Sequence, residues 1–190
     1  MAVELEAKLA VDSHDEVRVR LPAVGADRMG FVLETNAIFD SASRSLLAND
    51  EGLRVRGLDV IDGPARPATL TYKGPKRPGP LKQREEIEVS ISDAQAARSL
   101  LVALGFVEAL TFQKRRETWA LDECHIELDE LPHLGHFVEV EGPDGDAVHG
   151  VLERLGLSDR PIIKTSYIAL LIDHCRRHDL PTERIEFPSD

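Results

Sequence analysis

The sequence predicts an α+β fold in which a closed eight-stranded antiparallel β-barrel has helices packed outside it. Two observations lead to this prediction. Several short segments alternate charged and apolar residues, which is the two-residue period of a β-strand. Between them lie two capped helical segments that both end in Leu-Gly. About eight strands can close around a space that holds side chains or one small ligand.

The first half of the chain consists mainly of predicted strands. Val3 to Leu9 alternates, and Ser13 then caps a short helix carrying Val17 and Leu21. Further strands, with the spacing of an antiparallel meander, are predicted at 31–39, 53–58, 68–73 and 83–91. Two stretches rich in turn-forming residues interrupt them, a polar one at 42–52 and a basic, mobile loop at 74–80.

The second half alternates helices with strands. Ser92-Asp93 caps a helix that Gly105 ends, with Leu101 on its apolar face. The remaining elements are predicted as strands at 112–120, 124–129 and 136–141 and as helices at 146–155 and 165–174. We therefore expect one domain over residues 1–176 and a polar C-terminal tail over 177–190.

Composition narrows the class of protein. The chain has 190 residues, a net charge of −11 and two cysteines, Cys124 and Cys175, without the spacing of a disulfide framework or a zinc site. No apolar run is long enough to cross a membrane, and the N-terminus lacks the pattern of a signal peptide. These features predict a cytoplasmic protein without a membrane partner. The negative charge argues against nucleic-acid binding.

Acidic residues share one face of the first and last predicted strands. Glu4, Glu6 and Lys8 lie on one side of the first strand, and Glu139 and Glu141 lie on one side of another. Glutamates supply the hard oxygen ligands that hold Mg²⁺ or Mn²⁺ beside phosphates. The alternative is that these are exposed strands with solvated glutamates.

Basic residues are concentrated in the middle third of the chain despite the negative total. They share strand faces and suit phosphate binding, because an Arg-x-Arg strand points two guanidinium groups to one side. The set is Arg54, Arg56, Lys73, Arg84, Lys114 and Arg116. The alternative is cross-strand ion pairing with Glu86 and Glu88. The charged faces would line the interior, and the helices would cover the apolar faces.

A third face carries His125, Glu127 and Asp129, of which Asp129 could orient a cation or a substrate. Glu127 could equally be solvated. The histidines have no zinc-ligand spacing, so we interpret them as non-catalytic. No Walker loop, nucleophile elbow or dinucleotide fingerprint is present.

Taken in order, these motifs resemble the CYTH superfamily of triphosphate tunnel metalloenzymes, and most of all its class IV adenylate cyclase branch. The resemblance starts at Glu4-Leu5-Glu6-Ala7-Lys8 and ends at Lys164-Thr165-Ser166-Tyr167. The segments between them that carry it include Leu53-Arg54-Val55-Arg56, Tyr72-Lys73-Gly74-Pro75, Lys114-Arg115-Arg116, Ile126-Glu127-Leu128-Asp129 and Leu134-Gly135-His136-Phe137-Val138-Glu139-Val140-Glu141.

The resemblance implies a closed tunnel that binds a triphosphate together with Mg²⁺ or Mn²⁺. Glu4, Glu6, Glu139 and Glu141 become metal-ligand candidates, and the six basic residues become triphosphate-binding candidates. Lys164 joins the triphosphate-binding set, while Lys8 and Asp129 become catalytic candidates. Lys8 could act as a general base only if neighbouring cations lowered its pKa, and a metal-bound hydroxide is the alternative base.

The implied activity has alternatives. Class IV cyclases convert ATP to cyclic AMP and pyrophosphate, whereas other members hydrolyse thiamine triphosphate or inorganic tripolyphosphate. A third hypothesis is a non-catalytic triphosphate or polyphosphate sensor, which has little need of four metal-ligand glutamates. The expected partner is a small-molecule triphosphate, and a homodimer is possible.

Overall fold

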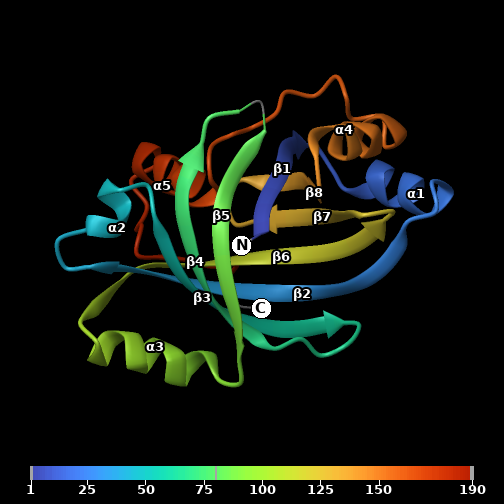
Figure 1. The fold of residues 1–190 in the computed structure, drawn as a ribbon. Coiled ribbons are helices and arrows are strands. Elements are labelled where there is room, and N and C mark those ends of the chain that lie inside the picture. Colours follow the sequence, from blue (N-terminus) through green and yellow to red (C-terminus); the bar gives the residue numbers. More distant parts are fainter. Residues whose placement is uncertain (1, 80, 189–190) are drawn as a thin grey trace.

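The protein has an α+β architecture in which one nine-stranded sheet forms a ring (Figure 1). The structure is a computed structural model that describes residues 2–79 and 81–188, without the side chains of 2–4 and 82. Its strands are β1 (Ala2–Val11), β2 (Asp27–Ser41), β3 (Gly52–Asp62), β4 (Ala68–Arg77), β5 (Lys82–Ile91), β6 (Phe106–Leu121), β7 (Cys124–Leu131), β8 (Gly135–Gly142) and β9 (Arg184–Ile185). Its helices are α1 (Asp15–Ala23), α2 (Ser45–Ala48), α3 (Ala94–Ala103), α4 (Gly145–Arg154) and α5 (Tyr167–Arg177).

Pairing between β2 and β6 closes the ring. The strands follow the order β2-β3-β4-β5-β1-β8-β7-β6-β9, and β2 also pairs with β6 from Asp27↔Ala120 to Ser41↔Phe106. Every pairing among β1 to β8 is antiparallel. The α+β class is therefore confirmed. The predicted all-antiparallel set of eight strands needs one correction, because the two-residue strand β9 pairs with β6 in parallel through Thr111 and Phe112.

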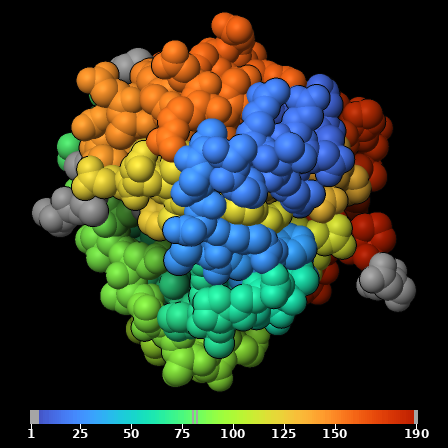
Figure 2. All heavy atoms as spheres, turned by 90° about the vertical axis from the view of Figure 1, so that its right-hand side faces the viewer, coloured from blue at the N-terminus to red at the C-terminus, as the bar shows by residue number. Residues whose placement is uncertain are grey.

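Helices α1 and α4 cover the apolar outer face of β1, as the alternation predicted. Ala7 and Leu9 of β1 are fully buried in a cluster that includes Val17 of α1 and Val151 of α4. Figure 2 shows α1, in blue, beside the orange segment that contains α4. Arg20 of α1 also donates a hydrogen bond to the carbonyl of Leu155, 2.6 Å away. The strand period thus sends apolar side chains outward to the helices and the charged side chains inward.

Two further apolar clusters attach α3 and α5. Leu101 of α3 packs with Val55 and Phe39, and Leu171 of α5 packs with Phe112 and other side chains of the second cluster. Phe112 shares its strand face with the cavity residue Lys114, so α5 packs against inner faces at one end of the sheet, and the prediction that the helices pack outside is wrong for α5. The predicted helix starts agree with the caps: Asp93, Asp144 and Ser166 each accept a hydrogen bond from a backbone N–H of the first helical turn. None of the described helices has the length and apolar character that a membrane crossing requires.

The segments expected as loops are more ordered than predicted. Strand β4 continues to Arg77, with an irregular register between Lys73 and Lys76, so the expected loop at 74–80 begins too early. Asp50 accepts hydrogen bonds from the backbone and the side chain of Lys76. Within 42–52, Asp40 accepts hydrogen bonds from two backbone N–H groups of α2. Long-range side-chain contacts, which local composition does not reveal, hold these segments.

Candidate functional site

The ring encloses a cavity of about 570 Å³ whose wall carries both signs of charge. Its described lining includes nine of the residues predicted from the sequence: Glu6, Arg54, Arg56, Lys73, Arg84, Lys114, Arg116, Glu139 and Glu141. These residues come from six different strands and meet only because the sheet closes. The chemical roles assigned to them stay predictions. Their gathering on one inner wall is a property of the structure.

Arg116 is at the centre of the charged network. It donates two hydrogen bonds to Asp129, at 2.7 and 2.6 Å, and one to Glu139 at 2.6 Å. Lys114 lies 3.2 Å from Asp129. Burial opposes the charge of Arg116, but Asp129 and Glu127 outweigh it and raise the pKa of the guanidinium well above its ordinary value. Asp129 itself is fully buried and lies behind these two cations, outside the described lining.

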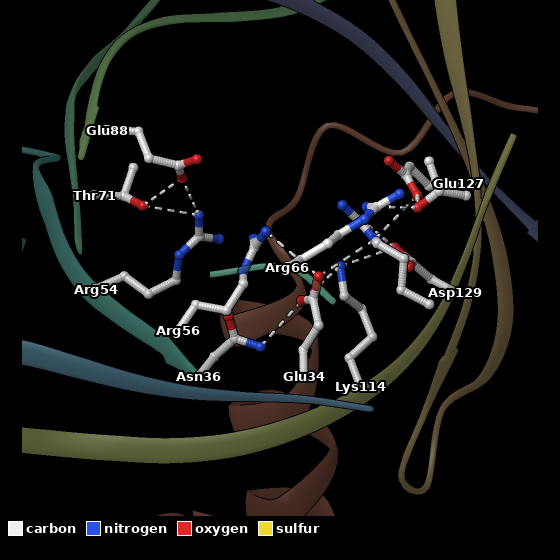
Figure 3. A network of polar contacts seen from close by, with 12 residues as sticks. Glu34, Asn36, Arg54, Arg56, Arg66, Thr71, Glu88, Lys114, Glu127 and Asp129 are labelled. Carbon is white, nitrogen blue, oxygen red and sulfur yellow. Dashed lines mark hydrogen bonds and ion pairs between the residues drawn. The ribbon is translucent and has the colours of Figure 1, made fainter. Parts of the chain in front are cut away.

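The sequence analysis missed Glu34 of β2. This buried carboxylate lies 3.4 Å from Arg56, 3.4 Å from Lys114 and 3.8 Å from Arg116 (Figure 3). Burial alone would raise its pKa, but these cations hold the pKa of Glu34 well below its ordinary value. Asn36, two residues along, donates to Glu34 and accepts from Arg56. Both polar residues fall on one face of the strand predicted at 31–39, and that spacing was the available signal.

The cations of β3, β4 and β5 have carboxylate and carbonyl partners of their own. Arg54 contacts Thr71 at 3.1 Å and Glu88 at 3.5 Å, and Lys73 pairs with Glu86. The alternative of ion pairing with Glu86 and Glu88 is thus also correct, because both glutamates line the same cavity. Burial, followed by the charge of Arg56, lowers the pKa of Arg54 to about 10. A bound anion would relieve this unfavourable environment.

Arg84 has a different setting from the other cations. It donates to the backbone carbonyl of Gly74 at 2.7 Å and to that of Asp50 at 2.6 Å. These bonds fix the guanidinium against the turn-rich segments before β3 and within β4.

The sequence did not decide whether Glu127 belongs to the site or is solvated. In the structure Glu127 lines the cavity and accepts a hydrogen bond from Thr118. Its burial raises its pKa.

The predicted metal-ligand glutamates lie on adjacent strands. Glu6 of β1 pairs in register with Glu141 of β8, and Lys8 pairs with Glu139 two residues along. Burial raises the pKa of Glu141, and the nearby charge of Glu6 raises it further. Crowded carboxylates at a cavity wall are a donor set that fits a hard divalent cation. The side chain of Glu4 lies outside the described residues.

Three or more His, Cys, Asp or Glu side chains do not converge into a ready-made metal group anywhere among the described residues. A Mg²⁺ ion does not require such a group, because it is commonly bound by one or two protein carboxylates together with water and substrate phosphates. Glu6, Glu139 and Glu141 therefore fit a metal that is bound jointly with its substrate.

Two other predicted lysines lie apart from the described lining. Lys8 is 1% exposed; its Nζ lies 3.9 Å from Glu139 and 4.2 Å from the centre of the Tyr167 ring. Lys164 donates to the carbonyl of Gly79 at 2.8 Å, on the exposed segment between β4 and β5. Lys8 thus contacts the charged network through the aromatic ring of Tyr167 and the carboxylate of Glu139. Lys164 instead connects the segment before α5 with the segment between β4 and β5 through its hydrogen bond to Gly79.

One end of the cavity is apolar. Along β2, the inward residues change from Glu34 and Asn36 to Ile38, which faces Leu110 across the ladder with β6. Apolar side chains of β2, α2, β3, β6 and α5 line this end: Ile38, Phe39, Leu47, Leu53, Leu110, Phe112, Ile168 and Ile172. In Figure 1, α2 and α5 lie beside the same end of the ring. Asp40, Arg44 and Glu51 add polar groups there.

Comparisons with known proteins agree with this arrangement. The family model described as CYTH domain matches residues 2–165. A protein of Methanocaldococcus jannaschii named as a candidate adenylate cyclase is 30% identical over 177 residues, covering 88% of this chain and 98% of the relative. The adenylate cyclase CyaB of Aeromonas hydrophila is 28% identical, covering 88% of this chain and 87% of the relative.

Solved structures share the fold over most of their length. A Pyrococcus horikoshii protein superimposes with a TM-score of 0.76 at 30% identity, covering 90% of this chain and 98% of the other. A candidate adenylyl cyclase from Hippeastrum, described as having a dominant triphosphatase activity, superimposes with a TM-score of 0.68 at 18% identity. That match covers 95% of this chain and 97% of the other.

Proposed function

The chain belongs to the CYTH domain family, and we propose that it is a metal-dependent enzyme acting on a nucleoside or other organic triphosphate. The observation that carries this proposal is the cavity, which combines inward arginines and lysines, a separate set of glutamates and an apolar end. A triphosphate chain needs several positive charges, its metal needs oxygen ligands, and its organic group needs apolar contact. All three occur on one continuous wall.

The phosphate chain binds among the cations of β3, β4, β5 and β6. Arg54 and Arg56 point planar donor groups into the cavity, and Lys114 and Arg116 face them from β6. Their partners Glu34, Asp129 and Glu88 hold the cations in place before substrate enters. Preorganised cations of this kind stabilise the charge that moves onto the leaving phosphate oxygen during reaction.

Glu6, Glu139 and Glu141, together with the predicted ligand Glu4, would hold Mg²⁺ or Mn²⁺. When bound, such an ion neutralises phosphate charge and orients the phosphate oxygens for in-line displacement. Lys8 contributes a fixed positive charge beside Glu139, because both the carboxylate and the ring of Tyr167 attract its ammonium group. Asp129 acts through Arg116 and Lys114, which it holds from behind.

The apolar end favours an organic substrate over inorganic tripolyphosphate. Tripolyphosphate has no group that gains from contact with Leu110, Ile168 or Ile172. A nucleoside or thiamine group can bury its ring there while the phosphates reach the cations beyond Asn36. The change of lining along β2 therefore gives the substrate one preferred direction in the cavity.

Cyclisation of ATP is the first candidate reaction. The 3′-oxygen of the ribose bonds to the α-phosphorus, the bond from that phosphorus to the bridging oxygen breaks, and pyrophosphate leaves. The names of the Methanocaldococcus and Aeromonas relatives support this reaction. The second candidate is hydrolysis, in which the oxygen of water bonds to the terminal phosphorus, the bond from that phosphorus to the bridging oxygen breaks, and orthophosphate and the diphosphate are released. The triphosphatase activity described for the Hippeastrum protein favours keeping this candidate.

Product analysis tests the proposal. Purified protein is given ATP, thiamine triphosphate or tripolyphosphate with Mg²⁺ or Mn²⁺, and the products are resolved by chromatography. Equal amounts of cyclic AMP and pyrophosphate from ATP identify a cyclase, whereas release of orthophosphate identifies a triphosphatase. Tight triphosphate binding without any product would overturn the enzyme proposal in favour of a sensor.

A further inference from the structure

The aromatic ring of Tyr167 lies against two lysines of the charged network. Tyr167 is the first residue of α5, lines the cavity and is 8% exposed. The Nζ of Lys8 lies 4.2 Å from the centre of its ring, and the Nζ of Lys114 lies 5.4 Å from it. Both distances fall within the range in which the negative face of an aromatic ring attracts a cation.

The position of this ring is fixed by the packing of α5. Phe137 meets it edge-on at 5.2 Å, and Leu171, one turn further along α5, is fully buried in the same apolar cluster. Ser166 caps the helix immediately before it. The hydroxyl of Tyr167 is buried and interacts with the carboxylate of Asp129, although no hydrogen bond of normal geometry forms between them. The face of the aromatic ring, and not the hydroxyl, makes the contacts with the two lysines.

We propose that Tyr167 is a positioning residue that holds the ammonium groups of Lys8 and Lys114 for the triphosphate, so that α5 completes the site. The inference rests on the proposed triphosphate function and goes beyond it, because it assigns a binding contribution to a neutral side chain on a helix that closes one end of the cavity. Lys8 comes from β1 and Lys114 from β6, and the ring of Tyr167 is a surface that both ammonium groups share.

The aromatic ring of Tyr167 offsets the repulsion between the ammonium groups of Lys8 and Lys114. Two ammonium groups near one another repel, and burial removes much of the water that would screen them. Asp129 holds Lys114 at 3.2 Å, and Glu139 is 3.9 Å from Lys8. An additional carboxylate would compete with phosphate, whereas an aromatic face attracts both cations without adding a negative charge.

Calorimetric titration of inorganic tripolyphosphate in EDTA tests the proposal without catalysis. Tyr167→Phe keeps the aromatic ring, whose face makes the contacts with both lysines, and removes only the hydroxyl, so we expect it to retain most of the wild-type affinity. Tyr167→Leu keeps an apolar side chain and removes the ring, so we expect binding to weaken by about 5- to 30-fold. Equal affinities of the Phe and Leu variants would overturn the proposal.

Leu171→Val is the control for loosened packing of α5. Leu171 shares the apolar cluster with Tyr167 but has no aromatic face to attract a cation, so its variant should lower the melting temperature and leave tripolyphosphate affinity within about twofold. If Leu171→Val weakened binding as much as Tyr167→Leu at a similar loss of thermal stability, the effect would be one of helix packing and the positioning role would be wrong.

A double-mutant cycle with Lys8→Met locates the effect. If the ring acts through Lys8, the loss from Tyr167→Leu should be smaller in the Lys8→Met background by at least about threefold. Fully additive losses would contradict action through Lys8. Failure of the wild-type protein to bind tripolyphosphate and ATP would overturn the proposed function together with this inference, whereas wild-type binding that is insensitive to the ring would overturn this inference alone.

Discussion

Arg116 donates two hydrogen bonds to the carboxylate of Asp129, one from Nε at 2.7 Å and one from Nη2 at 2.6 Å. The carboxylate is fully buried, and Lys114 approaches the same oxygen that Nη2 contacts. A group in this position cannot reach a substrate without leaving its cations. The finding places Asp129 behind the cations and outside the described cavity lining, while the catalytic role that the motif predicts for it stays a prediction.

Asp129→Asn should destabilise the protein, because it removes the charge of a fully buried carboxylate that both Lys114 and Arg116 contact. We expect the free energy of unfolding to fall by about 3 kcal/mol, measured by urea denaturation without ligand. Glu130→Gln is the control: Glu130 is the next residue, pairs with Arg115 in a partly exposed position, and should cost less than about 1 kcal/mol. Unchanged stability with complete loss of turnover would instead place Asp129 at the substrate.

Glu34→Gln should strengthen the binding of tripolyphosphate while weakening the fold. The carboxylate competes with phosphate for Arg56, Lys114 and Arg116, so its neutralisation should tighten binding by about fivefold in EDTA, with a steeper salt dependence. Glu117→Gln is the matched control, since Glu117 is a buried carboxylate between two arginines outside the cavity lining. It should lower stability only. Weaker tripolyphosphate binding by Glu34→Gln would contradict this role.

Glu141→Gln should reduce metal-supported turnover at least about 100-fold, because it removes an oxygen ligand without changing the size of the side chain. Chelation of the wild-type protein by EDTA should have the same effect and should be reversed by added Mg²⁺ or Mn²⁺. Glu108→Gln, which alters an ion pair with Arg98 away from the cavity lining, is the control. Wild-type rates in Glu141→Gln would remove Glu141 from the set of metal ligands.

Acid should destabilise the protein partly through His14. Burial lowers the pKa of this imidazole, and His136 and Arg18 add to the lowering, whereas its hydrogen bond to the Phe137 carbonyl and the charge of Asp129 oppose it. The unfolded chain therefore takes up the proton first, so stability falls as pH drops through about 6.5 toward the lower pKa of the folded state. Urea denaturation at pH 7.5 and 5.5 should show a smaller acid-induced loss for His14→Gln than for wild type. An equal loss in both would exclude His14 as a source.

The alternation of residues was sufficient to predict most of the fold. Segments such as Glu4 to Lys8 and Arg54 to Arg56 place their charges on one face of a strand, and about eight strands are enough for a sheet to close. Strand ends were less predictable: β2 runs from Asp27 to Ser41 because β6 pairs with it over its whole length, and that partner lies about 80 residues away in the chain. The short strand β9 depends likewise on a docking site that only the folded β6 supplies.

Site residues could be predicted where two like charges alternate along a strand. A single charged residue within a mainly apolar strand was harder to recognise. Arg-x-Arg and Glu-x-Glu motifs are visible in the sequence. Glu34 stands between Leu33 and Thr35, and its importance depends on three cations from other strands. Tyr167 was visible only as part of a motif, because a ring's contact with two lysines depends on how α5 packs.

A crystal structure with the non-cyclisable analogue α,β-methylene-ATP and Mn²⁺ tests the central claim most directly. The account predicts that the three phosphates lie among Arg54, Arg56, Lys114 and Arg116, with Mn²⁺ on the side of Glu6, Glu139 and Glu141. The adenine should lie at the apolar end, against Leu110 and Ile168. A nucleotide bound outside the cavity, or with its adenine among the arginines and its phosphates at the apolar end, would contradict the account.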